Sequence, residues 1–415
     1  MDDAEDHDAV ADRPAADTGP LAGVRVVEAG SMISGPTAGR LLADFGADVV
    51  KVERPEAGDH LRHFGPQADG HGVWWKYLAR NKRSVTLDLA APDGAAVFAD
   101  LVSEADLLVE NFRPGTLEGW GVGPETLRET SPGLVVLRVS GFGQTGPDAE
   151  RPGFGTLAEA MSGFAAVNGF GDRPPLLPPT GLADTVAGVF GALAAAMALY
   201  ARDGSRREVR GQTIDDSLIE PMLMLLGPQV LRYDATGETE RRTGNRSTSS
   251  APRNVYETAD GEYVALAASA QPLAMRTFDA IDRPDLKTDP RFADNESRLA
   301  NVAALDRIVG AWMADHTRAE ALAAFDDADA AAAPVYDVPD VLADEQYRAR
   351  DAAVAVDDPD LGRSLVQDVV PTLSETPGGI DHLGPALGAH NDAVYGGLLG
   401  YDEATRAALR DDGVI

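Results

Sequence analysis

The sequence has no cysteine and very little lysine. The absence of cysteine among its 415 residues excludes disulfide bonds, thiolate nucleophiles and cysteine-ligated metal sites. Counting along the chain gives 45 aspartates and 22 glutamates, whereas only four of the 36 basic residues are lysines. The net charge of -31 excludes a basic nucleic-acid-binding surface, because phosphate backbones would repel it. Abundant aspartate with scarce lysine predicts adaptation to concentrated salt; a merely acidic protein is the alternative.

Long hydrophobic segments are also missing. The longest apolar run, residues 186–201, has 16 residues, which is short of the roughly 20 needed to span a bilayer and predicts a buried helix. Residues 1–20 contain seven acidic residues and one arginine, which predicts a disordered acidic tail rather than a signal peptide. We therefore expect a cytoplasmic protein with no membrane partner.

From Leu21 the chain alternates between strand-like and helix-like patterns. The strand candidates are residues 24–29, 48–52, 84–89, 106–110 and 134–140, and helices are expected at 35–42 and 92–104. This alternation predicts an α/β fold with a mostly parallel sheet. Ligands of such sheets bind at the carboxyl ends of the strands, so the loops that follow the strands are the first places to look for a site.

The pattern changes beyond the alanine-rich helix and indicates a second, smaller α+β domain over residues 211–333. The elements expected there and beyond are a strand at 212–218, helices at 219–232 and 300–333 with a loop near 332–334, a hairpin of 254–258 with 263–267, a strand-like run at 364–370 and a last helix at 402–409. Residues 334–415 then form a separate terminal part.

A glycine-rich segment and seven histidines are the first candidates for chemistry. Residues 141–146 spell G-x-G-x-x-G after a predicted strand, but the proline-rich residues that follow are unsuited to the helix that a dinucleotide site requires. Close approach of a ligand to the Gly141 and Phe142 backbone is the better interpretation. The histidines form no H-E-x-x-H motif, so no metal site is predicted.

Asp184 is the acidic residue that stands out, because it immediately precedes the apolar helix. One interpretation is a helix N-cap, since aspartate is a favoured capping residue and the helix dipole stabilises its charge by about 0.3–1 kcal/mol. The other is a nucleophile, since a helix N-terminus would keep a partly buried carboxylate ionised and aimed. The local sequence alone leaves both interpretations open.

A series of motifs runs from Leu21 to the end of the chain. They are residues 21–26 (LAGVRV), Gly35-Pro36, residues 46–54 (GADVVKVER), Gly58-Asp59, residues 81–84 (NKRS), residues 109–115 (VENFRPG), the loop 141–147, Asp184 with Gly188, Asp260-Gly261 and residues 387–392 (LGAHND). In this order and spacing the sequence resembles the family III CoA-transferases, the group that contains formyl-CoA transferase, carnitine CoA-transferases and α-methylacyl-CoA racemase.

The resemblance implies a particular fold. Members have a Rossmann-like large domain made of N- and C-terminal parts, a small central domain, and two ring-like subunits threaded into an interlocked homodimer. Applied to this chain, the resemblance implies that residues 21–210 and 334–415 are the two parts of the large domain. Residues 211–333 would be the small domain with its linkers.

The resemblance also implies a mechanism and a set of site residues. The carboxylate matched by Asp184 attacks an acyl-CoA thioester to give an aspartyl anhydride and then an aspartyl-CoA thioester. Coenzyme A is thus a substrate, and no permanently bound cofactor is expected. The positions expected to contact CoA are Ile33, Ser34, Arg54, Asn111, Phe112 and Ser140, with Lys82 and Arg113 as phosphate candidates whose alternative is solvated surface charge.

Departures from the family patterns narrow the reaction. Ile33 stands where formyl-CoA transferase has a glutamine, which argues against oxalate-type substrates. Phe154 and Gly155 replace the His-Asp pair of the racemase, and racemisation needs bases near the α-carbon. We therefore expect CoA transfer, with an acyl-CoA racemase or isomerase, or a non-catalytic CoA-binding protein, as alternatives.

The substrates are expected to be an acyl-CoA and a short dicarboxylate, with succinyl-CoA as donor and a mesaconate-like acceptor. Arg246 and Arg253 could pair with the free carboxylate of such an acyl group. The alternative is that both arginines balance charge on a very acidic surface.

Overall fold

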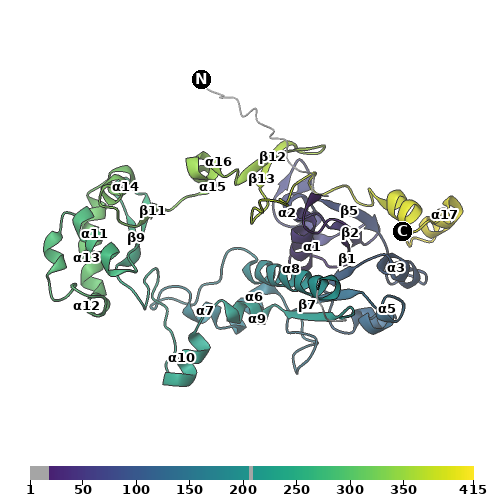
Figure 1. Ribbon diagram of the computed structural model, residues 1–415, viewed down its shortest axis with the longest axis horizontal. Coiled ribbons are helices and arrows are strands. Elements are labelled where there is room, and N and C mark those ends of the chain that lie inside the picture. Colours follow the sequence, from purple (N-terminus) through teal and green to yellow (C-terminus); the bar gives the residue numbers. More distant parts are fainter. Residues whose placement is uncertain (1–17, 205–208) are drawn as a thin grey trace. The chain divides into compact units, whose positions relative to one another are not determined.

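The computed structural model describes residues 18–204 and 209–415, and its largest sheet has six strands (Figure 1). The strands are β1 (Arg25–Glu28), β2 (Asp48–Glu53), β5 (Lys82–Thr86), β6 (Leu107–Glu110), β7 (Val135–Ser140) and β8 (Thr213–Ser217). Their order is β5-β2-β1-β6-β7-β8 and every neighbouring pair is parallel. This is the doubly wound order, so the predicted parallel α/β sheet is confirmed, and the order reverses between β1 and β6.

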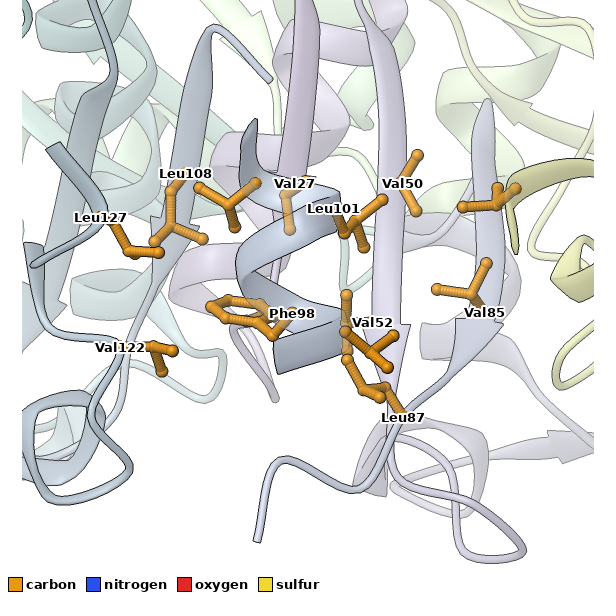
Figure 2. Packing of buried hydrophobic residues seen from close by; sticks show 14 of the residues in the cluster. Val27, Val50, Val52, Val85, Leu87, Phe98, Leu101, Leu108, Val122 and Leu127 are labelled. Carbon is orange, nitrogen blue, oxygen red and sulfur yellow. The ribbon is translucent and has the colours of Figure 1, made fainter. Parts of the chain in front are cut away.

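Helices cover both faces of this sheet. Successive residues of a strand point to opposite faces, and in the buried strands apolar residues occur on both faces, so both need to be covered. On one face, Val26 and Val49 pack with α1 (Ser34–Asp44) and α8 (Leu182–Asp203). On the other face, Phe98 and Leu101 of α3 (Gly94–Ser103) pack among the valines and leucines of four strands, as Figure 2 shows. Apolar burial on both faces explains why the strands are nearly continuous hydrophobic runs.

The C-terminal residues complete the core on the α3 face. The antiparallel hairpin β12 (Ala353–Asp358) and β13 (Gly362–Gln367) is followed by the π-helical segment η4 (Asp392–Leu398) and by α17 (Glu403–Asp411). Tyr395 of η4 is fully buried, and its hydroxyl donates to the carbonyl oxygen of Thr86 at 2.6 Å. The C-terminal residues therefore belong to the same core as strands β1, β2, β5 and β6.

Contacts between residues divide the chain into two compact units. The first contains residues up to 164, 178–227 and 350–415, and the second contains 165–177 and 228–349. The predicted boundary at 211 is wrong, because residues 213–217 form β8, which pairs with β7 at the edge of the large sheet. The second unit also extends beyond the predicted end at 333.

The second unit has its own core. The sheet order is β11-β10-β9, with β9 (Arg253–Glu257), β10 (Tyr263–Ala267) and β11 (Ala332–Pro334) antiparallel, and the residues predicted as a loop at 332–334 are strand β11. The sheet packs against α11 (Gln271–Ala280), α13 (Val302–Ala314) and α14 (Arg318–Asp327). Thr317 and Glu320 form a capping box that begins α14.

The remaining elements are short. They are β3 (Gln67–Ala68), β4 (His71–Gly72), η2 (His60–Arg62), α2 (Val73–Leu78), α4 (Thr116–Gly119), α5 (Pro124–Thr130), α6 (Gly155–Met161), α7 (Phe164–Val167), α9 (Ile219–Met224), α10 (Gln229–Thr236), η3 (Pro284–Lys287), α12 (Asn295–Ala300), α15 (Val338–Ala343) and α16 (Glu345–Ala349). The single helix predicted over 219–232 is two helices, because Gly227 adopts a positive φ of 62° and Pro228 follows it. Most of the predicted acidic tail lies outside the described residues.

Lysine is nearly absent from the protein surface. Lys51, Lys76 and Lys82 are all buried, and each forms an ion pair with a carboxylate. Lys287 is the remaining lysine of the sequence, and it pairs with Asp279 in the second unit. The positive charge displayed by the described residues is therefore carried almost entirely by arginine.

Candidate active site

Asp184 lies in the first turn of α8, and its carboxylate is half-buried. Gly181 is the N-cap of this helix, so the interpretation of Asp184 as the N-cap is wrong. A Cβ atom at Gly155 would lie 2.2 Å from Asp184 Oδ2, and one at Gly181 would lie 2.9 Å from Ile33 Cδ1. Two glycines and the Ile33 side chain therefore shape the space in which the carboxylate lies.

The pKa of Asp184 is raised from its ordinary value to about 6, first by burial and then by the negative charge of Glu159. A hydrogen bond from the Gly155 backbone N–H opposes this shift. The net shift is therefore opposite to the direction expected from a helix N-terminus, because burial outweighs the local hydrogen bonding. At neutral pH the carboxylate is still mainly ionised and can act as a nucleophile.

The loop after β1 passes beside Asp184 and is held by Asn111, at the end of β6. Asn111 Oδ1 accepts the N–H of Ser31 at 2.8 Å, and its amide nitrogen donates to Ser31 O at 2.7 Å and to Ser34 Oγ at 3.2 Å. These contacts join the two strands at which the sheet order reverses, where doubly wound folds bind ligands. Asn111 therefore shapes the loop that carries Ile33 and Ser34, both of which are buried.

A buried ion pair holds the same loop from its other side. Lys51 Nζ lies 2.7 Å from Asp59 Oδ2 and also donates to the carbonyl oxygen of Gly30. Asp59 Oδ1 accepts the N–H of Met32 at 3.2 Å, and Met32 has a positive φ of 62°, which is uncommon for a residue with a side chain. The position of Ile33 beside the carboxylate thus depends on contacts from β2 and β6.

Lys82 cannot serve as the predicted phosphate ligand in this arrangement. It is fully buried, its Nζ lies 2.6 Å from Glu28 Oε2, and it donates to Pro36 O at 2.8 Å. Burial lowers its pKa to about 8 despite the attraction of Glu28. The prediction that Lys82 binds a phosphate is wrong. Lys82 is the first residue of strand β5, and its side chain points into the fold, where its charge is already paired with Glu28.

Arg54 and Arg113 are exposed at the carboxyl ends of β2 and β6. Neither side chain forms an ion pair within residues 18–204 and 209–415. Phe112 packs edge-on against Trp120 with the ring centroids 5.3 Å apart, and its N–H donates to Glu110 Oε2 at 2.7 Å. These two arginines beside an anchored aromatic residue remain suitable for a phosphate-bearing ligand.

The glycine-rich segment is a pair of packed backbones rather than a dinucleotide loop. A Cβ atom at Gly141 would lie 2.5 Å from Gly153 Cα, so the two chains touch at these residues. The next helix after this segment is α6, which begins only at Gly155, so the third glycine of the motif does not open a helix. Ser140 is buried with its hydroxyl unpaired, and Phe142 lies beneath the Arg151 guanidinium at 5.2 Å.

Arg246 and Arg253 belong to the second unit. Arg246 Nε lies 2.5 Å from Asp306 Oδ2, and the Tyr256 hydroxyl donates to Asp306 Oδ1 at 2.8 Å. This pairing favours the charge-balance interpretation of Arg246. Arg253 is exposed at the start of β9. In the part of the chain that the structure describes, no cluster of three histidine or acidic residues could hold a metal ion.

Glu159 of α6 is the site residue that the sequence argument missed. It is 2% exposed, and its Oε1 accepts the N–H of Ala183 at 3.3 Å. Glu159 lies four residues after Gly155 and therefore on the same side of α6. This spacing indicates a site residue only once α6 is known to lie against α8.

The site combines a doubly wound α/β sheet with a half-buried carboxylate beside its switch-point loops, a combination suited to an enzyme. Comparison with known sequences makes the class of enzyme definite, since residues 21–391 match CoA-transferase family III. The chain belongs to this family, and the protein is a CoA-transferase, an enzyme whose substrates are CoA thioesters.

Relatives match nearly the whole chain. Succinyl-CoA–D-citramalate CoA-transferase of Chloroflexus aurantiacus is 44% identical over 397 residues, covering 95% of this chain and 98% of its own. Succinyl-CoA:mesaconate CoA-transferase of Haloarcula hispanica is 35% identical over 350 residues, covering 82% and 86%. The crystal structure of a CAIB/BAIF family protein from Brucella suis has a TM-score of 0.80 at 32% identity, covering 92% and 99%.

Ionisation of Asp184 should cost stability, and this cost can be measured. Because its pKa is higher in the folded than in the unfolded chain, the wild type loses stability as pH rises between about 4 and about 6. The variant Asp184→Asn avoids this loss and should be more stable at pH 8 by on the order of 1 kcal/mol, with a smaller difference at pH 5. Thermal unfolding across this pH range tests the expectation.

Asp203→Asn is the matched control, since Asp203 lies at the exposed end of the same helix. Its stability difference from the wild type should not change between pH 5 and pH 8. A difference for Asp184→Asn that is equally flat would contradict the assigned ionisation.

Proposed function

We propose that this enzyme transfers CoA from succinyl-CoA to a short dicarboxylic acid, with Asp184 as the covalent nucleophile. The observation that carries the proposal is the half-buried Asp184 carboxylate, with its pKa of about 6, in a space kept open by Gly155 and Gly181. The relatives named above as succinyl-CoA-dependent transferases support the donor. Mesaconate and citramalate are the first acceptors to examine.

The proposed reaction exchanges groups on one carboxylate. An Asp184 oxygen attacks the thioester carbon and the carbon–sulfur bond breaks. CoA leaves as a thiolate, and a mixed succinyl–aspartyl anhydride remains on the enzyme. The thiolate then attacks the aspartyl carbonyl, which releases succinate and leaves an aspartyl-CoA thioester. The acceptor carboxylate reverses these two steps, so no net proton or electron is needed.

CoA is proposed to bind along the carboxyl ends of β2, β1 and β6. Arg54 and Arg113 supply exposed guanidinium groups for phosphates, and Phe112 supplies an aromatic face. Ile33 and Ser34 border the same edge, while Ser140 and Gly141 lie at the end of β7. Arg253 in the second unit stays a candidate for the free carboxylate of the acyl group.

Trapping tests the covalent step directly. Incubation with succinyl-CoA and hydroxylamine should convert Asp184 to a hydroxamate, which peptide mass spectrometry detects as a mass change at this residue. Asp184→Asn should lose at least about 1000-fold in turnover, whereas Asp203→Asn should retain it.

The trapping proposal fails if the hydroxamate forms on another residue or if Asp184→Asn keeps full turnover. Uptake of deuterium at the α-carbon without any acceptor acid would instead identify a racemase or isomerase. Tight CoA binding with no exchange across a panel of carboxylic acids would identify a CoA-binding protein without transferase activity.

A homodimer is proposed from the outer face of α8. Val189, Leu193, Met197 and Tyr200 are exposed by 47–69% and recur at intervals of three or four residues, so they share one side of the helix. By length and composition α8 could cross a membrane, but its opposite side fills the core of the first unit. An apolar stripe of this kind in a cytoplasmic enzyme is suited to a second copy of the chain.

Light scattering after size-exclusion chromatography tests the dimer. The wild type should have twice the mass of the chain, and the double substitution Leu193→Asp with Met197→Asp should halve it. Leu365→Asp is the matched control, because Leu365 is 61% exposed on β13, away from α8. Monomeric wild-type protein at micromolar concentration would contradict the proposal.

Adaptation to concentrated salt is proposed from the charge distribution. The chain carries a net charge of -31, and three of its four lysines are buried in ion pairs. Raising KCl from about 0.1 M to about 2 M should increase both the unfolding temperature and the transfer rate, because self-repulsion is screened. Highest activity and stability in dilute buffer would contradict the adaptation.

A further inference from the structure

Glu159 occupies an unusual position beside the nucleophile. Its buried carboxylate accepts the backbone N–H of Ala183 at 3.3 Å, which is one of the first amide groups of α8. The N-cap residue, Gly181, has no side chain to accept it. The first residue of the same short helix, Gly155, donates its N–H to Asp184. Helix α6 therefore contacts the nucleophile and the amide that precedes it.

This arrangement places a second negative charge beside Asp184. Burial raises the pKa of Glu159, and the Ala183 N–H opposes this shift by stabilising the charged form. Ionisation of Asp184 then adds a like charge in a partly desolvated space. Burial is the largest cause of the raised pKa of Asp184, and Glu159 is the next. A carboxylate with a higher pKa is also a stronger nucleophile once it is ionised.

The other charged groups around α8 do not provide this effect. They lie on α1 (Arg40 and Asp44), β7 (Arg138), β8 (Asp215 and Asp216), α9 (Glu220) and the far end of α8 itself (Arg202 and Asp203). Arg40 pairs with Asp44, Arg138 with Glu110 and Glu118, and Arg202 with Asp106 and Asp203.

The acidic groups of β8 and α9 lie beside a different part of the helix. Asp216 Oδ2 faces Gly191, where a Cβ atom would lie 3.1 Å away, about two turns beyond Asp184. Asp215 accepts the N–H of Gln144, and Glu220 accepts the hydroxyl of Ser217. Among the described residues, Glu159 is the one whose charge acts on Asp184.

We propose that Glu159 is a positioning residue for the transfer reaction: its carboxylate holds the Ala183 amide in the first turn of α8, and its charge makes the Asp184 carboxylate a stronger nucleophile. This inference rests on the proposed role of Asp184. It differs from a simple capping role, because a neutral side chain with the same acceptor oxygen would maintain the cap but would not supply the charge.

The variant Glu159→Gln separates the two roles, since its amide oxygen can still accept the Ala183 N–H. In the pH profile of kcat/KM, the acidic limb should move down by about one pH unit. On the plateau kcat should fall about threefold, as expected for a carboxylate one pKa unit weaker with a Brønsted dependence near 0.4–0.5 like that of thiolates, and KM should change little. Asp216→Asn is the control and should leave the limb in place.

A second measurement needs no catalytic activity. Glu159→Gln is compared by thermal unfolding in the wild type and in the Asp184→Asn background. At pH 8 the substitution should raise the unfolding temperature more in the wild type, because it relieves repulsion between two charges. At pH 5 this extra stabilisation should disappear, since Asp184 is then protonated.

The outcomes separate the two claims. An unmoved acidic limb, together with no difference between backgrounds at pH 8, overturns the role of the Glu159 charge and leaves only a cap. A clear difference between backgrounds without any transfer activity supports the electrostatic pairing and contradicts the proposed function. Normal transfer activity with no difference between the two backgrounds contradicts the role of the Glu159 charge and leaves the proposed function intact.

Discussion

The architecture of the site depends on holding one half-buried carboxylate in a charged form. The Asp184 carboxylate can lie close to the backbone of Gly155 and Gly181 because these two residues have no side chains. It receives one hydrogen bond from Gly155, and its neighbour Glu159 repels it, so its charge is less stabilised than that of a surface acid. The sheet contributes by bringing the loop after β1 beside it, with Asn111 and Asp59 fixing the path of that loop.

Several buried charges elsewhere in the first unit are paired with opposite charges. Lys51 lies between Glu28 and Asp59, Lys82 contacts Glu28, and Arg138 contacts Glu110. Removing one partner from such pairs would leave an uncompensated charge, so they stabilise a single arrangement of the loops. Asp184 differs from these pairs because the charge that acts on it, that of Glu159, has the same sign, as is also the case for Asp216 beside Glu220 and Asp215. Perturbed acids of this kind are enriched at functional positions.

Much of the first unit could be predicted from local sequence. Apolar runs placed β1, β2, β6 and β7 to within one residue of their ends, because buried parallel strands are nearly continuous in hydrophobic residues. Asp184 was identified as a candidate by its place before an apolar helix and by the family resemblance. The mostly parallel sheet followed from the alternation of strands and helices, whereas its Rossmann-like character was implied by the family resemblance.

The misses arise from contacts between residues distant in sequence. Lys82 resembles a surface phosphate ligand until Glu28, more than fifty residues earlier in the chain, is found beside it. The boundary at 211 was misplaced because β8 belongs to the large sheet. It pairs with β7, although the long helix α8 separates the two strands in sequence. Glu159 was missed because its importance depends on how α6 lies against α8, which no short motif records.

Transfer of oxygen from the acceptor to the enzyme tests the central claim most directly. With an acceptor acid labelled with ¹⁸O in its carboxylate, each turnover should leave one labelled oxygen on Asp184, because the bridging oxygen of the anhydride stays with the aspartate when thiolate attacks the acyl carbon. Peptide mass spectrometry should find the label on Asp184. Formation of the new CoA thioester without label on Asp184 would contradict the account.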